Sequence, residues 1–64
     1  MDDMDKKVLE ALDQHSFLAR LHYNPAQTAQ YLGMKDMATL IYAERGLEIA
    51  YDEETEKHRF IKAE

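Results

Sequence analysis

The chain has no cysteine, no tryptophan, one proline and two glycines among its 64 residues. Without cysteine it can form no disulfide and offers no thiolate to a metal ion. We expect a cytoplasmic protein, because very small extracellular domains usually carry disulfides. No apolar run is long enough for a membrane-spanning helix, and no signal peptide is visible.

Positive charge is also scarce. Eight lysines and arginines stand against 13 aspartates and glutamates, so the net charge is −5. This balance argues against a non-specific nucleic-acid coat and against an anionic membrane surface as partner. The acidic residues gather in two runs, at 2–13 and 48–56, and a short basic segment at 57–62 follows the second run.

A chain of 7.5 kDa has room for one domain, over residues 1–64. Such a small domain buries little apolar surface, and it usually gains stability from a disulfide, a metal or a partner chain. Its first segment repeats apolar residues in steps of three and four, which predicts an amphipathic helix over 3–22. The stripe includes Met4, Val8, Leu12 and Leu21. We interpret it as a core face or as the contact surface of a homodimer.

Two further helices are predicted over 24–45. Asn24 and Pro25 end the first helix and begin the second, because Asn caps helices and Pro suits the first helical position. Gly33 is placed where a left-handed residue ends a helix, and Asp36 would cap a third helix that stops before Gly46. After Gly46 the apolar residues alternate, which predicts a β-hairpin over 47–62. The expected fold is mostly α with a small β-hairpin: three helices plus a two-stranded wing.

The spacing of Ala29 and Gly33, and the stretch from Thr39 to Leu47, resemble the helix-turn-helix of MerR-type regulators. Residues 58–60 stand where phage excisionases and MerR-like proteins place a wing. The resemblance covers residues 24–62 and implies a winged helix-turn-helix in a small DNA-binding regulatory or accessory protein. It places DNA contacts on the reading helix and the wing, at Lys35, Thr39, Tyr42, Arg45, Lys57, Arg59 and Lys62.

A second hypothesis is an acidic protein-binding module that docks on a basic protein partner. The sequence departs from the family pattern at Ile41, where an arginine is usual, and Arg45 is the only cation in the expected reading helix 36–45. Phosphate contacts supply much of DNA affinity, so few cations favour a protein partner. The two acidic runs would then steer association with a surface of opposite charge.

Catalysis, metal binding and cofactors are not expected. Ser16 is the only serine, and its neighbour His15 points to a different side of the helix. No glycine-rich loop follows a strand, so no phosphate cradle is predicted. His15 and His22 lie about 10 Å apart along a helix, too far to share one ion.

Overall fold

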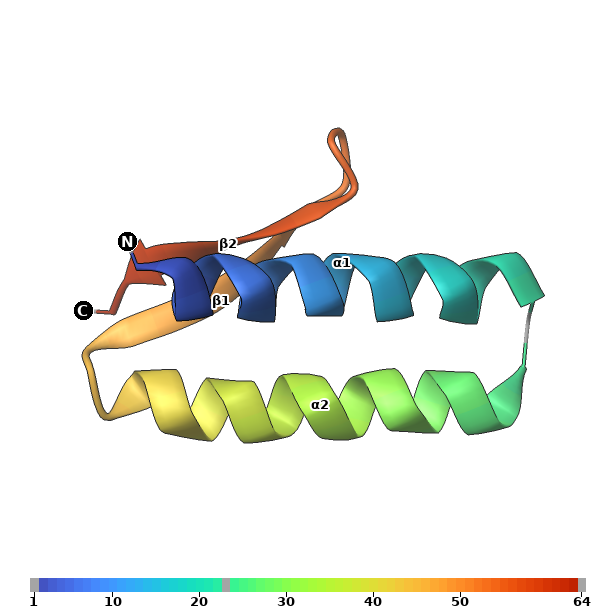
Figure 1. The fold of residues 1–64 in the computed structure, drawn as a ribbon, viewed down its shortest axis with the longest axis horizontal. Coiled ribbons are helices and arrows are strands. Elements are labelled where there is room, and N and C mark those ends of the chain that lie inside the picture. The colour runs from blue at the N-terminus through green and yellow to red at the C-terminus, as the bar shows by residue number, and fades with distance from the viewer. Residues whose placement is uncertain (1, 23, 64) are drawn as a thin grey trace.

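A computed structural model describes residues 2–22 and 24–63. Its elements are α1 (Asp3–His22), α2 (Pro25–Ala43), β1 (Leu47–Asp52) and β2 (Lys57–Lys62). The two helices lie side by side and antiparallel, and the hairpin of β1 and β2 crosses one side of the pair, with β1 against α2 and β2 against α1 (Figure 1). The predicted first helix and the predicted hairpin are both present.

The prediction of three helices is wrong, because α2 runs without a break from Pro25 to Ala43. Gly33 has no positive φ, unlike Gly46, and the Thr39 hydroxyl donates to the Lys35 carbonyl inside the same helix, 2.7 Å away. The residues around Gly33 are good helix formers, and a glycine inside a helix costs only about 1 kcal/mol. Packing along the whole of α1 outweighs that cost. The helix-turn-helix expected over 24–45 is therefore absent.

The ends of α2 follow the capping signals in the sequence. The Asn24 side chain accepts a hydrogen bond from the Ala26 N–H at 2.9 Å, and Pro25 takes the first helical position. At the other end, Gly46 adopts φ 73° and its N–H donates to the Ala43 carbonyl at 3.0 Å. This left-handed residue turns the chain sharply from α2 into β1.

The register of the hairpin decides which side chains meet the helices. Tyr51 pairs with His58 and Ile49 pairs with Phe60, so these side chains share the face that packs on α1 and α2. The opposite face points outward and carries Glu48, Ala50, Lys57, Arg59 and Ile61. In the turn, Asp52 accepts from the Glu54 N–H at 2.9 Å.

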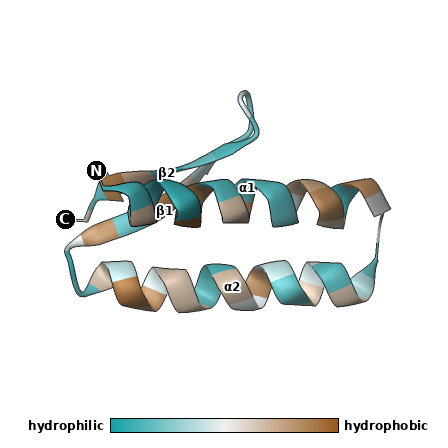
Figure 2. Ribbon diagram, viewed as in Figure 1, coloured by the Kyte–Doolittle hydropathy of each residue, from teal (hydrophilic) through white to brown (hydrophobic). Residues whose placement is uncertain are grey.

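The core lies where the two helices and the hairpin meet, and it is thin. Leu12, Ala38 and Tyr42 form its buried centre, and Leu12 is the most deeply buried of these three, at 1% exposed. Half-buried residues complete it: Val8, Tyr31, Met34, Leu47, Ile49 and Phe60. Hydrophobic residues nevertheless recur along both helices (Figure 2). Many of them are exposed, because the hairpin covers only one side of the helix pair.

Candidate interaction surface

Two of the predicted DNA contacts are engaged inside the protein. The buried Tyr42 hydroxyl donates to Asp5 Oδ1 at 2.7 Å, and Arg45 donates to both Asp5 oxygens at 2.9 and 3.2 Å. Hydrogen bonds from Arg45 and then from Tyr42 hold the pKa of Asp5 below its ordinary value. Sequence reasoning missed Asp5, although a carboxylate seven residues before Leu12 lies on the apolar stripe of α1 and has to find a partner there.

The other predicted contacts do not gather on one surface. Lys57 and Arg59 lie on the outer face of the hairpin, where Lys57 stands opposite Asp52 in the register. Lys62 stands opposite Leu47 at the base of the hairpin and points to the other face of the strand. Lys35 and Thr39 lie one turn apart on α2. The seven residues are thus spread over several surfaces, and an acidic side chain faces one of the wing cations.

A buried polar chain links β2 to both helices. The His58 ring is fully buried, its Nδ1 lies 2.7 Å from Asp13 Oδ1, and its Nε2 lies 2.7 Å from the Tyr31 hydroxyl. A carboxylate only accepts hydrogen bonds, so Nδ1 carries a proton and donates a hydrogen bond to Asp13, and Nε2 is hydrogen-bonded to the Tyr31 hydroxyl. The His58 backbone N–H also donates to Asp13, at 2.6 Å.

The side chains of Asp13, His58 and Tyr31 have the Asp–His–hydroxyl order of hydrolytic sites, but their chemistry suits a structural role better. Burial raises the pKa of Tyr31, which keeps its hydroxyl protonated and a poor nucleophile. The imidazole of His58 is closed off from solvent, so a substrate cannot reach it. We interpret the three side chains as a lock that holds the hairpin on the helix pair.

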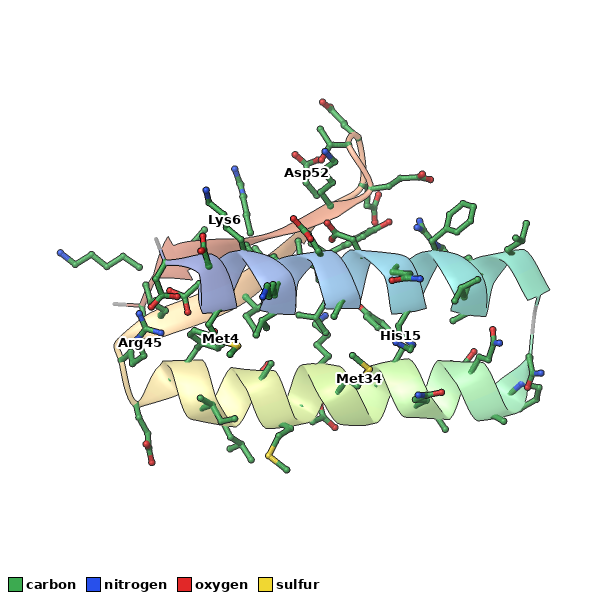
Figure 3. The ribbon with its side chains drawn as sticks, viewed as in Figure 1. Met4, Lys6, His15, Met34, Arg45 and Asp52 are labelled. Carbon is green, nitrogen blue, oxygen red and sulfur yellow. The ribbon has the colours of Figure 1, made fainter. Side chains whose placement is uncertain are left out.

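An apolar groove of about 620 Å³ runs between α1 and α2. It is lined by Met4, Val8, Ala11 and Leu12 from α1, and by Gly33, Met34, Met37, Ala38, Ile41 and Tyr42 from α2. None of these residues is charged, and none belongs to the hairpin. Met4 and Met34 point into the space between the helices (Figure 3). We call the outer part of this lining the groove face: Met4, Val8, Ala11, Met34, Met37 and Ile41.

The groove face is an apolar surface that is exposed to solvent over several neighbouring residues. Met4 is 65% exposed, Met37 60% and Ile41 54%, and their neighbour Leu40 is also largely exposed. Single exposed apolar residues are normal, but a contiguous apolar patch marks a binding surface in most soluble proteins. The sequence predicted a core face or a homodimer surface around Met4 without deciding between them, since the apolar spacing alone does not say which residues the hairpin will cover.

A second hollow, of about 740 Å³, lies at the other end of the helix pair, between α1, α2 and Tyr51. It has two cations on its wall, Arg20 and Lys35. Arg20 is already engaged, because it donates to the Tyr51 hydroxyl and lies 3.4 Å from Glu56. Unlike the groove face, this hollow therefore has charged residues in its lining, and one of them is bound within the protein.

Within residues 2–22 and 24–63, no three histidines or carboxylates lie close enough together to hold a metal ion. Over the same residues, neither helix combines the length and the apolar character needed to cross a membrane. Comparisons with protein-family models, curated proteins and solved structures found no match to this chain. Function is therefore inferred from the geometry of the chain itself.

Proposed function

We propose that this chain is a non-catalytic protein-binding module that receives an amphipathic helix of its partner on the groove face. The observation that carries the proposal is the uncharged groove of about 620 Å³, with Met4, Met37 and Ile41 more than half exposed along it. Covering apolar surface is favourable by about 25 cal/mol for each Å² removed from water. Helix-in-groove binding is a common way to do so.

Two details of the lining suit a helical ligand. Methionine side chains are flexible, so Met4, Met34 and Met37 can adapt to the ligand's apolar residues. Gly33 has no side chain, and the position where a Cβ would stand has no neighbour within 4 Å, so a ligand can approach the backbone of α2 closely.

The charge of the chain decides which helical peptide suits a binding test. With a net charge of −5, the module should bind a separate peptide faster when the polar side of that helix is basic, because opposite charges speed and orient association. DNA is a weaker proposal, because Arg45 is bound to Asp5 and Lys57 stands opposite Asp52, which leaves fewer cations for phosphates. We also propose that the module works in the cytoplasm, where small domains without disulfides are common.

The proposal is tested by NMR with two probes. Protein labelled at its methyl groups and backbone amides, at micromolar concentration, is titrated with a synthetic helical peptide that carries leucine on one side and lysine on the other. Mixed duplex DNA is titrated separately at about 50 mM salt, where electrostatic binding is strong. We expect the peptide to shift the methyl signals of Met4, Met37 and Ile41, and DNA to leave them unchanged.

A matched pair of variants identifies the surface. Ile41→Glu places a charge on the groove face and should weaken peptide binding by roughly tenfold or more. Ile61→Glu makes the same change on the outer face of the hairpin and should leave binding intact. Because both variants add negative charge, a loss with Ile41→Glu alone reports on the apolar groove. Peptide shifts confined to the acidic hairpin, or salt-sensitive DNA shifts at Lys57 and Arg59, would contradict the proposal.

A further inference from the structure

We propose that the natural occupant of the groove face is a second copy of this chain; this inference rests on the proposed function, since it names the partner of the same site. The single chain exposes more surface than is usual for its mass. The chain exposes 4959 Å², which exceeds by roughly 700 Å² the surface of about 4,200 Å² usual for a folded monomer of 7.5 kDa. That excess is close to the roughly 800 Å² that each partner buries in a stable interface.

The layering of the fold also leaves room for a second copy. The hairpin covers one side of the helix pair, and the residues that line the groove all come from α1 and α2. A second copy placed groove face to groove face makes a four-helix core with a hairpin on each outer side. Met4, Met37 and Ile41 of both copies are then buried together, and the thin core of the single chain gains the partner that a small domain without disulfides needs.

The charges at the rim of the groove face suit a symmetric dimer. Lys7 lies three residues after Met4, on the same side of α1, and Glu44 lies three residues after Ile41, at the end of α2. Both side chains are exposed. A two-fold axis parallel to the helices lays α1 of one copy along α2 of the other at the same level. Lys7 of each copy then lies close to Glu44 of the other, so the surface is complementary to itself.

Analytical ultracentrifugation from about 10 µM to 1 mM tests the inference. We expect the wild-type chain to form a dimer within this range, and Ile41→Glu to weaken dimerisation by roughly tenfold or more. Ile41 is 54% exposed in the single chain, so this variant should still fold, which circular dichroism verifies. Ile61→Glu is the control and should dimerise like the wild type. A dimer that persists in Ile41→Glu would overturn the proposal.

Charge reversal tests the arrangement of the two copies. Lys7→Glu should weaken the dimer by roughly twofold to thirtyfold, because the symmetric dimer loses two exposed ion pairs. Adding Glu44→Lys to Lys7→Glu should restore the wild-type affinity. If the double variant dimerises no better than Lys7→Glu alone, the packing of α1 on α2 of the second copy is overturned.

The two proposals can fail separately. A wild-type chain that stays monomeric at 1 mM but binds the helical peptide on the groove face overturns the second copy and leaves the proposed function standing. A chain that neither dimerises nor binds the peptide overturns both. A dimer with protected Met4 and Met37 methyl groups supports both.

Discussion

At the scale of single residues, the two glycines occupy opposite kinds of backbone. Gly46 has φ 73°, a conformation that other residues enter only at a cost, and it turns the chain from α2 into β1. Gly33 lies inside α2 with an ordinary helical backbone, and nothing lies within 4 Å of the position of its missing Cβ. An added methyl group would be crowded at neither site. Substitutions at the two glycines therefore test the effect of backbone conformation alone.

We expect alanine at these positions to have opposite effects. Gly46→Ala should lower the free energy of unfolding by about 1 kcal/mol, because alanine is strained at positive φ. Gly33→Ala should raise it by about 1 kcal/mol, because alanine is the better helix former. Urea unfolding at low protein concentration measures both. If Gly33→Ala destabilised the chain as Gly46→Ala does, α2 would not be continuous at this point.

At the scale of elements, a polar lock holds the hairpin on the helices in addition to the apolar packing of Leu47, Ile49 and Phe60. His58 reaches Asp13 on α1 and Tyr31 on α2, so one residue of β2 joins three elements. The Tyr51 and Phe60 rings add aromatic contacts, with Tyr51 against His58 and Phe60 against Tyr42, the latter at 4.4 Å between centroids. A hairpin of two short strands is marginal by itself, so its presence depends on this attachment.

Removing the acceptor of the lock should loosen the hairpin. Asp13→Ala leaves the His58 N–H and Nδ1 without a partner and should lower the free energy of unfolding by about 2–3 kcal/mol. Tyr31→Phe removes one hydrogen bond and should cost about 1 kcal/mol. Glu10→Ala, an exposed change on the same helix, is the control and should stay within about 0.5 kcal/mol of wild type. Chemical denaturation measures all three, and a neutral Asp13→Ala would argue against the lock.

At the scale of the whole molecule, the Asp5 cluster ties the start of α1 to the chain that follows α2. Asp5 meets Tyr42 and Arg45 across 37 and 40 residues of sequence. The same end of the helix pair carries Met4 and Ile41. The hydrogen bonds of Asp5 therefore also fix the position of α1 along α2 beside the groove. Stability and the proposed interaction surface therefore depend on one buried carboxylate.

The cluster of Asp5, Tyr42 and Arg45 predicts a specific response of stability to acid. The pKa of Asp5 lies below its ordinary value of 3.8, mainly because Arg45 donates hydrogen bonds to it. A depressed pKa in the folded chain adds stability above the unfolded value, and this stability is lost as the pH falls through the folded value. We expect stability to decline below about pH 4. Asp5→Asn should be less stable at neutral pH and should show a shallower decline, measured by thermal unfolding from pH 2 to 7.

Local signals in the sequence were sufficient for much of the fold. The apolar period of residues 3–22, the cap formed by Asn24 and Pro25, and the alternation of Leu47, Ile49 and Tyr51 each act within a few residues, so they are readable without the tertiary structure. The same reasoning failed from Gly33 to Asp36. There, the local preference for a turn is worth about 1 kcal/mol, and packing of α2 along α1 outweighs it.

The candidate surface shows the limit of sequence reasoning most clearly. The apolar residues of both helices can be read in the sequence, but nothing in the sequence distinguishes exposed Met37 and Ile41 from buried Ala38 and Tyr42. The hairpin decides which of these residues are buried, because it covers one side of the helix pair and leaves the other open. The pairs Asp5–Arg45 and Asp13–His58 join residues 40 and 45 positions apart. Short-range energetics made the first helix, the cap at Asn24 and the two strands readable from the sequence alone. The continuity of α2, the choice of which apolar residues are covered and the pairing of the carboxylates depend on contacts between elements, so they became visible only in the folded chain.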